Sequence, residues 1–213
     1  MRIHPVAVEV AKNVVENIEG RSADQGISLP VIGSTVALAG DGDHLDLGSL
    51  FGSSAIVAAL VKKELKIGGK VICLDPYIPR DPSISAGNMP PELLDGNPEA
   101  LMKNAERFGV ELTLIQEKSQ PWPKKLKDAK FSSALIDGDH IEDTPWLDFQ
   151  EVSKRCDGYI LIDNFEEGYP DVMSAIQKAM ESPDWFLHYK NYVCGVFRRK
   201  LPPRANGTPL SMM

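Results

Sequence analysis

Short apolar segments alternate with helical ones along most of this 213-residue chain, and this alternation constrains the fold more than any other feature. The apolar segments that read as strands are 44–49, 70–76, 110–116, 131–137 and 158–164. The segments with helical length and spacing are 53–69, 97–109, 146–156 and 171–180. The order predicts an α/β fold with a mostly parallel sheet covered by helices on both faces.

The two ends of the chain depart from this alternation. We expect residues 1–42 to form an N-terminal helix and cap segment, with the helix at 5–19 and a stretch containing Gly and Ser after it. Residues 185–200 hold two strands with no room for a helix between them, which predicts an antiparallel hairpin at one sheet edge. The core domain would then span 43–200, and residues 201–213 would be a flexible tail.

The connection 76–97 contains five prolines and two glycines and is much longer than most connections in an α/β domain. A loop of this kind is typical of a lid or a substrate-binding segment. We therefore expect it, together with the 1–42 segment, to recognise the substrate.

Composition narrows the class of partner. The chain carries 30 acidic against 23 basic residues, which argues against nucleic acid as the main partner. No apolar run approaches the ~20 residues that span a bilayer, so we expect a cytoplasmic protein without a membrane partner. Its three cysteines lie far apart and show no metal-ligand spacing.

A glycine-containing turn follows the first strand of the core domain. The strand delivers Asp46 and Gly48, and the turn continues to Gly52 at the start of the next helix. Glycines let backbone N–H groups approach a ligand, and a helix N-terminus favours an anionic group. The spacing is GxxxG rather than GxGxxG, which disfavours a nicotinamide dinucleotide. A plain strand–turn–helix remains the alternative.

Acids also end the later strands. Asp75 ends the second strand, about 25–30 residues after the turn, where an acid can accept from ribose hydroxyls. Asp137 ends the fourth strand, and Asp163 with Asn164 ends the fifth. Neighbouring parallel strands would bring these three oxygen donors together, and such donors suit Mg²⁺. Solvated strand ends are the alternative for each segment alone.

His140 follows Asp137 by three residues and would lie at the same edge of the predicted sheet. An imidazole titrates near neutral pH and can act as a general base beside a metal-bound hydroxyl. The alternative is that His140 is an ordinary polar residue on the surface.

These residues resemble class I S-adenosylmethionine-dependent methyltransferases. More narrowly, they are similar to the cation-dependent O-methyltransferases, which include catechol, caffeoyl-CoA and sugar-modifying enzymes. The resemblance covers roughly residues 40–200 and rests on "LDLGSLFGSS", "VICLDP", "LTLIQEKSQ", "LIDGDH" and "LIDNF". The family fold implies a Rossmann-like three-layer sandwich whose seven-stranded sheet has the order 3-2-1-4-5-7-6, with strand 7 antiparallel.

The resemblance also implies S-adenosylmethionine as the cofactor and assigns residues to it. The implied cofactor-binding residues are Asp46, Gly48, Gly52, Ser54, Asp75, Ser119 and Gln120. Within that set, Ser54 would meet the cofactor carboxylate, Asp75 the ribose, and Ser119 and Gln120 the adenine. The implied metal ligands are again Asp137, Asp163 and Asn164. His140 stands where the catechol-type enzymes often carry a lysine, so the identity of the base stays open.

Together these features lead us to expect a Mg²⁺-dependent O-methyltransferase that acts on a small hydroxylated molecule, catechol-like or sugar-like. A metal-independent methyltransferase and a non-catalytic S-adenosylmethionine-binding module remain alternatives. The sequence is compatible with a homodimer.

Overall fold

The computed structural model describes residues 1–20, 28–78 and 96–200. Most of the expected 76–97 loop, residues 79–95, lies outside the described residues, as does the expected tail at 201–213.

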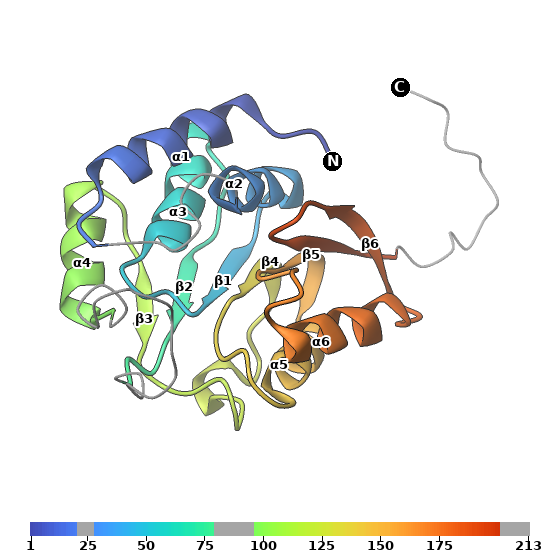
Figure 1. Ribbon diagram of the computed structural model, residues 1–213. Helices are drawn as coiled ribbons and strands as arrows, with labels where there is room; N and C mark the ends of the chain where they lie inside the picture. The colour runs from blue at the N-terminus through green and yellow to red at the C-terminus, as the bar shows by residue number, and fades with distance from the viewer. Residues whose placement is uncertain (21–27, 79–95, 201–213) are drawn as a thin grey trace.

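All seven strands belong to one sheet, in the order β3-β2-β1-β4-β5-β7-β6 (Figure 1). The first five strands pair in parallel, and β7 runs antiparallel to both β5 and β6. The strands are β1 (Asp43–Leu47), β2 (Val71–Leu74), β3 (Thr113–Ile115), β4 (Phe131–Ile136), β5 (Cys156–Ile162), β6 (Trp185–Lys190) and β7 (Gly195–Arg199). The predicted strand order and the predicted C-terminal hairpin are confirmed.

Helices cover both faces of this sheet and make it the middle layer of three. In Figure 1, α1, α2 and α3 lie on one side of the sheet and α5 and α6 on the other. The helices are α1 (Pro5–Asn17), α2 (Ser28–Ala39), α3 (Ser53–Leu65), α4 (Pro98–Arg107), α5 (Thr144–Ser153) and α6 (Pro170–Met180). None of these helices is long and apolar enough to cross a membrane.

Strand β2 is apolar throughout because helices cover both faces of the sheet there. In β2 every residue is buried, and successive side chains point to opposite faces. Val71 and Cys73 therefore pack in the core beneath α1–α3, whereas Ile72 and Leu74 pack in the core beneath α5 and α6. Burial on both faces is what removes the polar alternation seen in half-exposed strands.

Helix α2 (Ser28–Ala39) lies in the stretch for which the sequence predicts no helix, only Gly and Ser residues that follow the helix at 5–19. The helix packs against α1, α3 and the sheet, so most of its residues are buried and its sequence shows no charged face. Gly33 makes the close packing feasible: a Cβ there would lie 2.8 Å from Ala7 Cβ and 3.1 Å from Val61 Cγ2. The N-terminal segment thus contributes two helices to the core beneath α1–α3.

Candidate cofactor and metal site

The five parallel strands end in register, which brings their following residues to one edge of the sheet. The last paired residues form a single row across the sheet, and they are Ile115, Leu74, Leu47, Ile136 and Ile162. Backbone hydrogen bonds continue the row by one residue, since the N–H groups of Asp75, Gly48, Asp137 and Asp163 donate to the neighbouring strand. Ligands of open parallel sheets bind beyond this carboxyl edge. Four of the predicted site residues therefore lie side by side.

Gly48 allows β1 to end in close contact with β4. Its φ of +86° lies in the left-handed region, and a Cβ there would lie 1.9 Å from the carbonyl oxygen of Asp137. Only glycine combines that backbone conformation with that approach. Gly52, with φ of +90°, forms the N-cap of α3. The first turn of α3 therefore begins within a few residues of β1, with its free N–H groups next to the sheet edge.

Asp46 lies beneath this turn and is fully buried. Its Oδ1 accepts a hydrogen bond from the Ser49 hydroxyl at 2.8 Å, and its Oδ2 has no hydrogen-bond partner among the described residues. Burial raises the pKa of Asp46 to about 6, opposed by the Ser54 and Ser49 hydroxyls and reinforced by nearby carboxylates. A buried acid with an unused acceptor oxygen is suited to a cationic ligand group.

Asp75 follows β2 and is held by the backbone. Its Oδ2 accepts from the N–H of Leu50 at 3.0 Å, and its Oδ1 accepts from the N–H of Tyr77 at 2.8 Å. Both donors have positive φ, so the two turns are shaped around the carboxylate. Each carboxylate oxygen can accept a second hydrogen bond, which leaves capacity for a pair of ribose hydroxyls.

Ser119 and Gln120 lie in the segment after β3 and are half-buried. Gln120 Nε2 donates to the Oδ1 of Asp148 at 2.8 Å. Sequence reasoning did not select Asp148, which lies on α5 and is fully buried. In the sequence, Asp148 stands out only as an acidic residue between the apolar residues Leu147 and Phe149.

The predicted metal ligands follow two adjacent strands, as expected. Asp137 and Asp163 follow the paired residues Ile136 and Ile162, and Asp163 and Asn164 are both buried. Asn164 has a φ of +59°, a turn conformation that asparagine tolerates better than most residues. Two carboxylates and an amide are oxygen donors that suit Mg²⁺.

The described residues contain no group of three or more His, Cys, Asp or Glu side chains able to hold a metal ion. The predicted set has only two such residues, because its third donor is an amide. Its donor chemistry and its place at the strand ends are compatible with a metal, and the site remains a prediction.

His140 lies beside the first of these acids. Its Nε2 is 3.2 Å from Asp137 Oδ1, and its ring makes an edge-to-face contact with Tyr169 at 5.1 Å between centroids. Because a carboxylate accepts hydrogen bonds, this pairing favours the neutral tautomer with its proton on Nε2, in which Nδ1 is the acceptor nitrogen. The arrangement can orient a general base.

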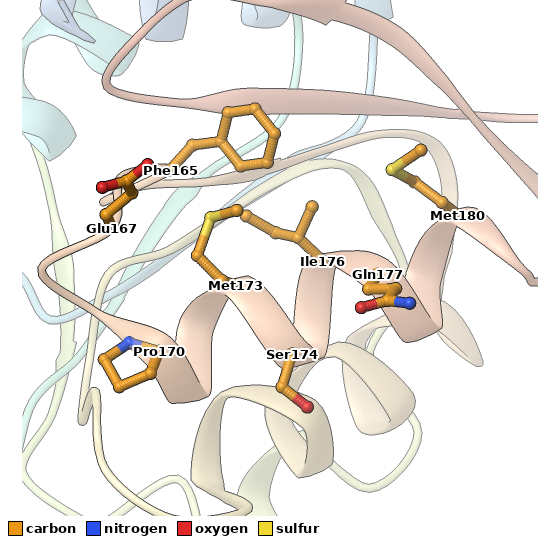
Figure 2. Close-up of a pocket in the computed structure, with 8 residues that line it drawn as sticks. All are labelled: Phe165, Glu167, Pro170, Met173, Ser174, Ile176, Gln177 and Met180. Atoms are coloured by element: carbon orange, nitrogen blue, oxygen red, sulfur yellow. The ribbon is translucent and has the colours of Figure 1, made fainter.

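A pocket of about 480 Å³ lies away from these residues, along α6. Figure 2 shows Met173 and Met180 projecting from α6 and Phe165 projecting from the segment after β5. None of the predicted site residues lines this pocket. Because the pocket contains none of these residues, we do not assign it to the cofactor.

The architecture is that of the class I methyltransferase fold. No family model and no curated protein matches the chain. Among solved structures, the chain is similar to the O-methyltransferase NovP, at 15% identity and a TM-score of 0.67 over 92% of this chain and 96% of that one.

Two further structures extend the comparison. An O-methyltransferase from Bacillus cereus, solved in complex with SAH, is 16% identical with a TM-score of 0.57, over 94% and 93% of the two chains. A precorrin-6y C5,15-methyltransferase from Geobacter metallireducens is 16% identical with a TM-score of 0.60, over 87% of this chain and 95% of that one. The shared property is the fold, which serves methyl transfer to oxygen in two of these proteins and to carbon in the third.

Proposed function

We propose that the chain is an S-adenosylmethionine-dependent O-methyltransferase that acts on a small hydroxylated molecule. The observation that carries the proposal is the placement of Asp46, Gly48 and Asp75 at the adjoining ends of β1 and β2. The likeness to methyltransferases of known structure supports it.

Each end of the cofactor has a matching group. The buried Oδ2 of Asp46 offers a carboxylate oxygen for the cationic methionine part, and the first turn of α3, which contains Ser54, offers a helix N-terminus for its carboxylate. Asp75 is held in place to accept from the ribose hydroxyls. Bound S-adenosylmethionine would supply a sulfonium methyl group for transfer to the acceptor oxygen, with S-adenosylhomocysteine as the leaving group.

Asp137, Asp163 and Asn164 are the residues that would hold Mg²⁺. A bound Mg²⁺ lowers the pKa of a hydroxyl that coordinates it. Two neighbouring hydroxyls, as in a catechol or a sugar, suit such a site, and we propose these as the acceptor classes. His140 takes the hydroxyl proton on Nδ1 while Asp137 holds its Nε2–H.

A turnover assay tests this proposal. Methyl transfer from S-adenosylmethionine to a panel of catechols and sugar alcohols is measured with Mg²⁺ and with excess chelator. We expect Mg²⁺-dependent transfer that is lost in Asp163→Ala. Asp157→Ala serves as the matched control, since Asp157 is an exposed acid near the start of β5, whereas Asp163 follows the end of that strand. Absence of transfer with every acceptor would contradict the enzyme assignment.

The second candidate is a methyltransferase that needs no metal. The observation that favours it is the His140–Asp137 pair, which already orients a base without any ion. Transfer that persists in chelator but is lost in His140→Ala would select this candidate. A protein that binds the cofactor and transfers no methyl group would instead be a binding module.

A further inference from the structure

Asp148 is a buried carboxylate to which the proposed chemistry gives no role. It is fully buried on α5, with Oδ1 bonded to Gln120 Nε2 at 2.8 Å. Its Oδ2 has no hydrogen-bond partner in the described part of the chain, and a Cβ on Gly138 would lie 3.8 Å from that oxygen. Asp148 therefore lies between the segment that follows β3 and the segment that follows β4.

A buried carboxylate at this position carries a desolvation penalty. Burial raises the pKa of Asp148 to about 6, with the Gln120 and Ser119 side chains opposing the shift and Asp139 reinforcing it. An apolar side chain of similar size would pack beside Phe149 without the desolvation penalty. Packing alone gives no reason for an acid here.

The hydrogen bond has a consequence for Gln120. An amide can present either its donor NH₂ or its acceptor oxygen, and the two are similar in shape. An ionised carboxylate can only accept, so Asp148 fixes Nε2 on its own side and turns Oε1 away. Gln120 can then contact a ligand only through Oε1, which accepts a hydrogen bond.

We propose that Asp148 is a positioning residue that orients Gln120 so that the site accepts a 6-aminopurine and rejects a 6-oxopurine. Adenine carries a donor at position 6, which matches Oε1, whereas hypoxanthine carries an acceptor there, which meets Oε1 unfavourably. The inference rests on the proposed function, because it assumes that a purine nucleoside cofactor lies beside Ser119 and Gln120.

The test compares two ligands that differ at position 6 and, with it, at N1, which is an acceptor in adenine and an N–H donor in hypoxanthine. S-adenosylhomocysteine and its hypoxanthine analogue, S-inosylhomocysteine, are titrated calorimetrically into the wild-type protein, Asp148→Asn and Asp148→Leu. We expect the wild type to prefer the adenine ligand by roughly 10–100-fold, the effect of one unpaired buried polar group. Asp148→Asn, whose amide can pair with Gln120 in either orientation, should weaken the preference. Asp148→Leu frees the amide to rotate and should reduce the preference to a few-fold.

Gln120→Met provides a second measurement should Asp148→Leu fail to fold. Gln120 is half-buried, and its replacement should abolish the preference while the protein stays folded. An unchanged preference in folded Asp148→Leu, or in Gln120→Met, would overturn the inference. Equal binding of both ligands by the wild type would overturn it and leave the proposed function standing, whereas binding of neither ligand would overturn the proposed function itself.

Discussion

The backbone of Gly48 lies close to the end of β4, and one methyl group can probe this approach. In Gly48→Ala the new Cβ would lie 1.9 Å from the carbonyl oxygen of Asp137 unless β1 and β4 separate. The left-handed φ of +86° costs about 1–2 kcal/mol for a residue with a Cβ. Relief of the overlap adds about 1–3 kcal/mol. We therefore expect a loss of about 2–5 kcal/mol in the free energy of unfolding.

Thermal and urea unfolding measure this loss. For a chain of this size the expected decrease in Tm is roughly 5–15 °C. Gly40→Ala is the matched control, because Gly40 also has a positive φ, +71°, but a Cβ there meets nothing within 4 Å. The control should show the conformational cost alone, about 1–2 kcal/mol. Equal losses in the two variants would refute the close approach between Gly48 and Asp137.

Three other substitutions probe the acid beneath the turn, the core and the base. Burial raises the pKa of Asp46 from 3.8 to about 6, so the folded state binds this proton more tightly than the unfolded state does. The wild type therefore loses stability as the pH rises from about 4 to 6. Asp46→Asn should therefore stabilise the cofactor-free protein at pH 7 by at most about 3 kcal/mol and should have no such effect at pH 4. Thermal unfolding measures this change, and destabilisation at pH 7 would count against this account. Phe149→Ala removes a buried ring that stacks on Trp146 and contacts Trp185 and Phe197. Urea unfolding should show a loss of about 3–5 kcal/mol in the free energy of unfolding, and a loss below about 1 kcal/mol would disagree with this packing. His140→Ala should lower kcat about 10²–10⁴-fold with little change in cofactor affinity, and an unchanged kcat would remove His140 as the base.

The alternation of strands and helices was readable from sequence because both faces of the sheet are buried. That burial gives β2, β4 and β5 apolar carboxyl ends, and the change to Asp75, Asp137 or Asp163 marks where each of these strands ends. The full strand order came from the family resemblance, since residue patterns alone do not specify which strands pair across a crossover.

Helix α2 was missed for a related physical reason. Its residues are buried on nearly every side, so the chain shows no polar face at helical spacing, and its Gly and Ser residues resemble those of a loop. Gly33 is in fact a packing residue between α1 and α3. Local pattern therefore predicts elements that border solvent better than elements enclosed by other helices.

The predicted site residues are brought to one edge of the sheet, but their partners could not be inferred from the sequence. The backbone donors that hold Asp75 come from two turns whose positive φ values occur at Leu50 and Tyr77, neither of which is a glycine. The bond between Gln120 and Asp148 joins residues 28 positions apart. Contacts of this kind depend on tertiary packing, which no spacing rule encodes.

A calorimetric titration of S-adenosylmethionine into chelator-treated protein tests the central claim most directly, followed by Mg²⁺ and repeated on Asp163→Ala. The account predicts that both proteins bind the cofactor and that only the wild type gives a Mg²⁺ binding signal. Cofactor binding with no Mg²⁺ signal in the wild type would contradict the metal site. No cofactor binding by the wild type under any condition would contradict the claim that this sheet edge is a methyltransferase site.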